Sequence, residues 1–219
     1  MKKLLFFCIL FISATCLKAQ ELSTTPRGYH THDGFYLSMN AGPVFGKITD
    51  QLKSGYPPGT IGFTGNGGVF DFKIGWAVRE NLILHAALIS NGMVGPNVET
   101  TDAYGNTNNV KAPDTFGIGE AMYGLGITHY FMPSNLFVSG TLGVGNYSMM
   151  DEKDKANNGS TDTGFSLQLK LGKEWWISKN WGIGVSMSYG KTSVTNETIT
   201  NSEELNSNRF CILLNTTFN

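Results

Sequence analysis

The sequence has little cysteine, little proline and no excess of charge of one sign. Its 219 residues include 3 Cys and 7 Pro, and 16 Lys and Arg stand against 17 Asp and Glu. So few cysteines exclude a disulfide scaffold, and balanced charge without a basic cluster argues against a nucleic-acid partner. The one long apolar run is at the N-terminus, which excludes a membrane protein with several spanning helices. The length predicts a single folded domain, and the composition does not exclude a membrane β-barrel.

The N-terminal segment, residues 1–19, has the layout of a secretory signal peptide. Lys2 and Lys3 precede an apolar stretch, and Ala19 supplies the small residue before a cleavage site. That stretch has about 14 residues, whereas a bilayer-spanning helix needs about 20, so an uncleaved anchor is the weaker alternative. Lipid attachment at Cys16 is another. We expect export, then a periplasmic segment at 20–33 and a folded domain at 34–219.

A small group of possible metal ligands lies just before the first expected strand. His30, His32 and Asp33 supply two imidazoles and a carboxylate, which are competent ligands for a divalent metal. A flexible polar tail is the simpler interpretation of this segment. We therefore predict no metal site and no cofactor.

Apolar residues alternate with polar or small ones in eight segments of the remaining chain. In the clearest, 68–78, Phe70, Phe72, Ile74 and Trp76 occupy every second position. A period of two residues is typical of a strand with two different faces, and segments of about 10 residues are typical of membrane barrels. The segments are 34–46, 68–78, 82–89, 116–131, 136–147, 164–177, 181–191 and 209–218.

The connections between these segments alternate in length. Short turns fall near residues 80, 134 and 179, and four long polar connections lie between them, at roughly 47–67, 93–113, 148–163 and 192–207. Outer-membrane barrels have short periplasmic turns and long extracellular loops. The pattern predicts an all-β fold, an eight-stranded antiparallel up-and-down transmembrane β-barrel with both ends in the periplasm. A soluble barrel with its apolar face inward is the alternative, but the many glycines on the other face suit a narrow lumen.

Aromatic residues gather at positions that suit the two membrane–water interfaces. Part of an indole or phenyl ring prefers apolar surroundings while its edge tolerates water, so such rings concentrate at the headgroup level. The predicted lower belt consists of Trp76, Phe131, Trp175, Trp181 and Phe218. The predicted upper belt consists of Phe45, Phe70, Phe165 and Tyr189.

Several segments resemble those of a known group of proteins. These are the signal end at Ala19 and Gln20, the strand opening GFYL at 34–37, the run YGLGITHYF at 123–131 and the terminal strand ending at Phe218. Across the mature chain the sequence resembles small eight-stranded outer-membrane barrels of the OmpA and OmpX kind, in particular the outer-membrane β-barrel domain proteins of Bacteroidota. The resemblance implies insertion by the barrel assembly machinery and residence in the outer membrane. It implies little about activity.

The inward face of the predicted barrel carries ionisable side chains. They are Asp71, Lys73, His85, Glu120, Lys170 and Glu174. Charges in a narrow lumen need partners, so acids and bases should meet in hydrogen-bonded pairs that plug the barrel. A narrow gated channel for water, ions or small solutes is the alternative use of the same residues.

An enzymatic role has little support in the residues. Lipid-modifying enzymes on comparable barrels use a catalytic histidine, because removing a proton from serine near neutral pH requires a base of suitable pKa. The chain has four histidines and no Gly-x-Ser-x-Gly motif. His129 faces lipid by parity but lies beside a periplasmic turn. We predict a protein that is not an enzyme, with an outer-membrane lipid-modifying enzyme as the second alternative.

The long polar connections are most simply interpreted as a solvated surface, and a recognition surface is the alternative. Exposed loops carry function more often than the elements they join, and Tyr56 and Phe63 in the first loop are the candidate contacts with a host or cell-surface ligand. The other expected partners are outer-membrane lipid and lipopolysaccharide. We expect a monomer whose role is structural, in envelope integrity, or adhesive.

Overall fold

The structure is a computed structural model that describes residues 31–53, 57–155, 158–197 and 202–219. The predicted signal peptide, the segment 20–30 with His30, and Tyr56 lie outside the described residues. Among the described residues, no helix is long and apolar enough to cross a membrane.

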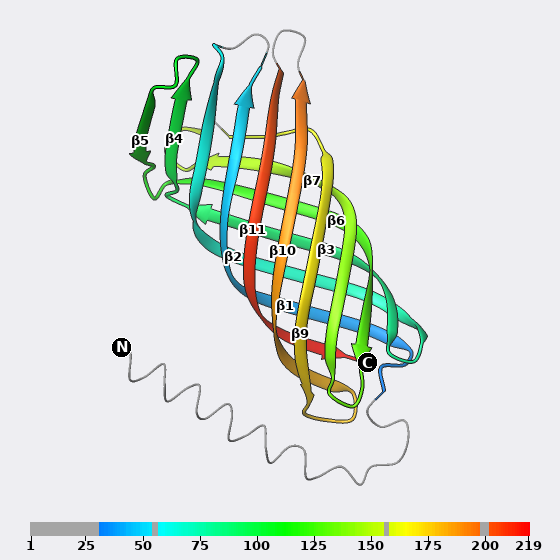
Figure 1. The fold of residues 1–219 in the computed structure, drawn as a ribbon. Coiled ribbons are helices and arrows are strands. Elements are labelled where there is room, and N and C mark those ends of the chain that lie inside the picture. Colours follow the sequence, from blue (N-terminus) through cyan, green and yellow to red (C-terminus); the bar gives the residue numbers. More distant parts are fainter. Residues whose placement is uncertain (1–30, 54–56, 156–157, 198–201) are drawn as a thin grey trace, which may run out of the picture. The chain divides into compact units, whose positions relative to one another are not determined.

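Eight long strands close into a ring (Figure 1). They are β1 (Phe35–Leu52), β2 (Gly59–Arg79), β3 (Leu82–Val94), β6 (Phe116–Phe131), β7 (Leu136–Asp151), β9 (Gly164–Trp176), β10 (Trp181–Glu197) and β11 (Ser202–Phe218). Each pairs antiparallel with the next, and β1 also pairs with β11, which closes the barrel. The predicted eight-stranded antiparallel barrel is confirmed.

Side chains alternate between the two faces of the wall, as the sequence pattern predicts. In β2, Phe70, Ile74 and Trp76 are 43–59% exposed on the outside, whereas Asp71 and Lys73 are almost fully buried inside. Successive side chains of a strand point to opposite faces, so an alternation with a period of two residues assigns each side chain to the outer or the inner face. The apolar face is therefore the outer face, which contradicts the soluble alternative with its apolar face inward.

The strands extend beyond the predicted ends at the side of the long connections. Residues 47–52 and 59–64, expected in a loop, continue β1 and β2 as one paired hairpin. The expected loop at 93–113 contains two more short strands, β4 (Asn97–Asp102) and β5 (Thr107–Lys111), and β8 (Gly159–Ser160) pairs with β7. Polar residues stand on the outer face of these extensions, so the apolar alternation ends although the backbone pairing continues.

Two strands approach each other closely at a pair of glycines. Gly124 in β6 and Gly143 in β7 are register partners. A Cβ on Gly124 would lie 2.5 Å from the carbonyl oxygen of Leu142, and a Cβ on Gly143 would overlap the carbonyl oxygen of Tyr123. Both obstacles are backbone atoms, so the close approach depends on glycine at these two positions.

Candidate functional site: the layered lumen

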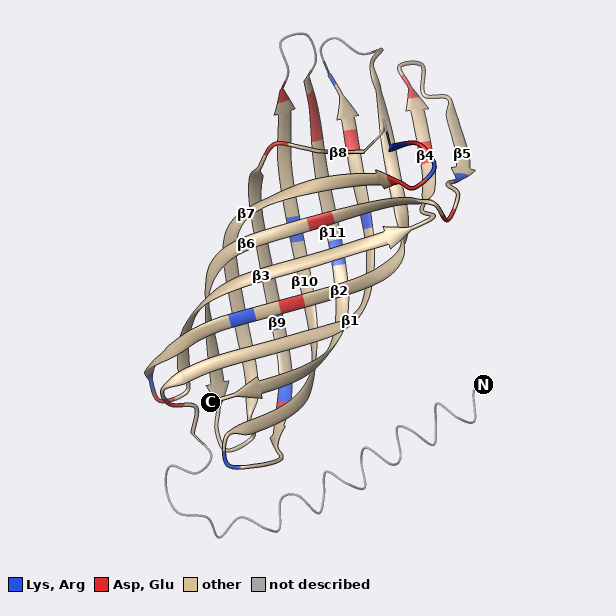
Figure 2. Ribbon diagram, turned by 180° about the vertical axis from the view of Figure 1, so that it is seen from behind, with Lys and Arg blue, Asp and Glu red and all other residues tan. Residues whose placement is uncertain are grey.

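The middle of the lumen holds a buried ion pair. Lys170 Nζ lies 2.5 Å from Asp71 Oδ2, and both side chains are almost fully buried. Lys73 Nζ donates to Ser139 Oγ at 2.9 Å, and His85 Nε2 lies 3.4 Å from the same oxygen. The structure thus brings four of the predicted lumen residues into one layer, and Figure 2 shows acidic and basic segments at several levels of the barrel.

A second polar layer lies nearer the end with the long hairpins. Glu120 is bonded to Arg209 and Thr192, and Ser207 Oγ donates to Glu120 Oε2 at 3.0 Å. Glu120 and Arg209 are each 3% exposed. Buried charges need both an opposite charge and further hydrogen bonds, and this carboxylate has both.

Arg209 is a lumen residue that the sequence prediction missed. It has the same parity in β11 as Cys211 and Leu213, which are buried, so the alternation itself could have identified it. Gly190 makes room for its guanidinium group, because a Cβ there would lie 2.5 Å from Arg209 Cζ. The fit between a glycine on β10 and an arginine on β11 is visible only in the folded chain.

The third polar layer surrounds Glu174 near the end with the short turns. Thr217 Oγ1 donates to Glu174 Oε1 at 2.8 Å, and the Tyr130 hydroxyl donates to Glu174 Oε2 at 3.2 Å. Tyr36, Tyr130, Ile83 and Phe137 form an apolar cluster at the same level. The carboxylate is held by hydroxyl groups in this layer.

The segment before β1 closes the lumen at this end, which corrects the prediction of a flexible tail at 31–33. His32 is 1% exposed and stacks on Tyr130 with ring centroids 3.5 Å apart. Its Nε2 lies 2.8 Å from Asn135 Oδ1, and its backbone both donates to and accepts from Asn81. Asn81 and Asn135 have positive φ in two short turns. The tail is ordered because these turn residues supply its hydrogen-bond partners.

Burial determines how the His32 imidazole titrates. Desolvation lowers its pKa below the ordinary value near 6.5, and the bond with Asn135 opposes this with a smaller effect. As the pH falls through that ordinary value, the unfolded chain takes up a proton that the folded chain resists. The contribution of His32 to folding is therefore present at neutral pH and declines in acid.

We expect this decline to disappear in His32→Gln, whose amide can form a hydrogen bond but does not titrate. The parent should lose stability relative to this variant between about pH 7.5 and about pH 5. Urea unfolding of both proteins in phospholipid vesicles measures the difference, and other titrating groups cancel between them. A difference that is the same at both pH values would contradict the buried neutral imidazole.

Apolar clusters separate and cap the polar layers. One, between the middle and upper polar layers, contains Val44, Val69, Ala87, Ile89, Met122, Cys211 and Leu213. The cap at the long-hairpin end contains Ile48, Phe63, Met93, Ile118, Tyr147, Val194 and Leu205. Phe63, predicted as a surface contact, is buried in this cap and is not available to a ligand. It is buried because β2 extends beyond its predicted start and directs the ring inward.

This arrangement fills the described part of the lumen with side chains. Ser139 and His85 approach as in a serine hydrolase, yet both are buried, and Ser139 already accepts from Lys73 and Thr128. A cavity of about 10 Å³ beside Glu120 and Arg209 has room for about one water molecule. In the described part of the chain, no group of three or more His, Cys, Asp or Glu side chains could hold a metal ion.

Aromatic rings form a belt on the outer face near the short turns. Trp76 contacts Phe35 at 6.4 Å between ring centroids, Phe35 contacts Phe218 at 6.3 Å, and Phe218 contacts Trp181 at 5.3 Å. These four rings come from the neighbouring strands β2, β1, β11 and β10. The structure places Trp175 half-buried in β9, with Lys173 Nζ 5.4 Å from its ring, and Phe131 exposed at the end of β6.

Comparisons with known proteins agree with this architecture. No family model matches the chain, and no curated protein matches it. Among solved structures, the match to Neisserial surface protein A covers 85% of this chain and 97% of that protein's chain, with a TM-score of 0.53 at 13% sequence identity. The match to the outer membrane protein OprG from Pseudomonas aeruginosa covers 87% of this chain and 98% of that protein's chain, with a TM-score of 0.51 at 12% sequence identity. The fold is that of the small outer-membrane β-barrels.

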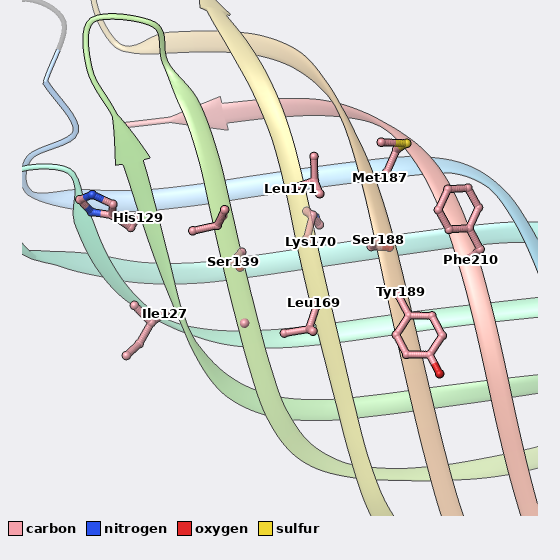
Figure 3. Close-up of a pocket in the computed structure, with 12 residues that line it drawn as sticks. Ile127, His129, Ser139, Leu169, Lys170, Leu171, Met187, Ser188, Tyr189 and Phe210 are labelled. Atoms are coloured by element: carbon pink, nitrogen blue, oxygen red, sulfur yellow. The ribbon is translucent and has the colours of Figure 1, made fainter.

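The outer wall of this outer-membrane barrel fold is apolar even where it is hollowed. A hollow of about 590 Å³ spans β6, β7, β9, β10 and β11, and Ile127, Leu169, Leu171 and Met187 line it (Figure 3). Gly140 contributes no side chain to the hollow. Such a lining suits contact with acyl chains, and the strands around the hollow are paired with one another.

Proposed function

We propose that the chain is exported by residues 1–19, inserted into the outer membrane by the barrel assembly machinery, and acts there as a closed barrel with a structural and adhesive role. The fold of small outer-membrane barrels, the apolar outer wall and the aromatic belt support this location. We assign the short turns and both ends of the barrel to the periplasm and the long hairpins to the cell surface. The resemblance to outer-membrane barrel proteins of Bacteroidota favours the same location.

The closed lumen is the observation that carries this proposal. The polar layers around Glu174 and Asp71 are joined through Thr217, Ser38 and Asn40. An apolar cluster separates the Asp71 layer from the layer around Glu120, and apolar side chains cap the long-hairpin end. An ion path needs continuous polar space, and apolar constrictions exclude water. The proposal therefore favours a sealed barrel over a channel, and a non-enzymatic role over lipid modification.

The long-hairpin end supplies the surface for contacts. Above the barrel, β10, β11, β1, β2, β4 and β5 continue as one paired sheet (Figure 1). At its edge, every residue of β5 is exposed, and Tyr104 in the turn between β4 and β5 is 91% exposed. Exposed aromatic side chains on a rigid support are typical of recognition surfaces.

We expect bacteria that display a variant with residues 98–110 replaced by a short Gly-Ser turn to lose adhesion about tenfold. The hairpin of β4 and β5 is outside the barrel ring, so its removal should leave the barrel closed. Retention of the bacteria on immobilised collagen and on a layer of the same bacteria measures the effect, with equal surface display as the control. If the variant adheres as well as the parent to both surfaces, the adhesive role assigned to this hairpin is wrong.

A further inference from the structure

The outer face of β10, β11 and β1 shows where the apolar surface ends. Tyr189, Phe210 and Phe45 are register partners across these strands, and each is 42–44% exposed. On the side of the short turns, the outer face continues with Met187 and Ile212, which are also exposed. An aromatic row above aliphatic residues is typical of the hydrocarbon boundary.

A basic row follows two residues further toward the long hairpins. Lys191, Asn208 and Lys47 are register partners on the same three strands, and all three are exposed on the outer face. The basic residue of β11 next to this row, Arg209, is buried in the lumen and is not part of the row. Because neighbouring strands are about 5 Å apart, the two lysines flank Asn208 within reach of a single anionic group.

The aromatic row and the basic row are joined by a hydrogen bond. The Tyr189 hydroxyl lies 2.6 Å from Asn208 Oδ1. Since this oxygen accepts the bond, the amide contributes its Nδ2 donors to the basic row. The row therefore presents two ammonium groups and an amide donor directly above an apolar aromatic surface.

We propose that Lys47, Asn208 and Lys191 bind the phosphate group of an anionic outer-leaflet lipid whose acyl chains lie against Tyr189, Phe210 and Phe45. Ammonium groups at the headgroup level attract phosphate, and the aromatic rings give the adjoining chains an apolar contact. This inference rests on the membrane insertion and orientation given under the proposed function. It adds a specific lipid site to that function.

One acidic side chain opposes this binding. Glu99 Oε1 of β4 lies 3.7 Å from Lys47 Nζ, and both side chains are about half exposed. An exposed ion pair of this kind is weak, so a phosphate held by two lysines can displace it. Removal of the Glu99 charge should therefore strengthen lipid binding, the opposite of the effect of removing the lysines.

The test compares lipid retention by the folded barrel in neutral detergent micelles. Native mass spectrometry measures binding of bisphosphorylated lipid A and of dephosphorylated lipid A to the parent, Lys47→Gln/Lys191→Gln, and Glu99→Gln. The matched control is Lys53→Gln/Lys111→Gln, which removes the same charge from two exposed lysines outside the basic row. Lys53 follows the end of β1, and Lys111 lies at the level of Lys47 but three strands away from it, on β5. We expect the first double variant to bind bisphosphorylated lipid A at least tenfold more weakly, Glu99→Gln to bind it more tightly, and the control to match the parent.

Three results would overturn the lipid site. The first is that Lys47→Gln/Lys191→Gln binds bisphosphorylated lipid A as tightly as the parent does. The second is that the parent binds dephosphorylated lipid A as tightly as bisphosphorylated lipid A. The third is that Lys53→Gln/Lys111→Gln loses as much affinity for bisphosphorylated lipid A as Lys47→Gln/Lys191→Gln does. Gel mobility with and without boiling shows that each variant is folded, and insertion of the parent into vesicles is measured separately. If the parent inserts and one of these three results is found, only the proposed lipid site is wrong. If the parent does not insert, the proposed function itself is contradicted.

Discussion

Replacement of Arg209 by methionine is expected to lower the free energy of unfolding by about 3–5 kcal/mol. Arg209 is the cation bonded to Glu120, and both are buried in the upper polar layer. Without it the buried carboxylate keeps its hydroxyl partners, Thr192 and Ser207, but has no opposite charge. Urea unfolding in phospholipid vesicles, followed by gel mobility without boiling, measures the loss.

The matched control for this variant removes both charges. Glu120→Gln/Arg209→Met leaves no uncompensated ion, so we expect it to recover a large part of the stability lost in Arg209→Met. If the double variant is as unstable as Arg209→Met, the loss comes from packing of the long side chain and not from an unpaired carboxylate.

Replacement of Asp71 by asparagine is expected to have an effect of similar size. Asp71 lies 2.5 Å from Lys170, and both side chains are almost fully buried, so loss of the carboxylate leaves this ammonium group in the middle layer without its anion. We expect a loss of about 3–5 kcal/mol at neutral pH, because an ammonium group is costly to bury alone. The same urea unfolding experiment measures it.

A second variant separates charge from shape at this position. Asp71→Asn/Lys170→Met removes the cation together with its anion, so it should be more stable than Asp71→Asn alone. The opposite order would show that Lys170 does not depend on Asp71 for its burial.

Much of the barrel could be predicted from the sequence, because the two-residue alternation of apolar and polar side chains determines which of them face outward and which face the lumen. The alternation in β2 placed Asp71 and Lys73 inside and Trp76 outside before any contact was known. Arg209 fits the same alternation. It was not assigned to the lumen because it is the first residue of the predicted eighth segment. Local pattern was thus sufficient wherever the outer face is apolar.

Two features could not be predicted, because they depend on contacts distant in the sequence. His32 is ordered by Asn81 and Asn135, which lie in two different turns and face it only in the closed barrel. Phe63 lies in an extension whose outer face is polar, so alternation gave no signal there, although backbone pairing continues and buries the ring. In both cases closure of the barrel supplies the partners.

Ion flux across vesicles that contain the inserted barrel shows whether the lumen is sealed. Unboiled gel mobility first establishes that the protein in the vesicles is folded, since a closed barrel with every strand paired resists detergent. If the lumen is sealed, we expect the flux with the parent protein to be no greater than in protein-free vesicles, at low and at high salt concentration. Ion flux above that level that changes in Lys73→Ala or Glu174→Ala would show that ions pass through the lumen and would contradict a sealed barrel.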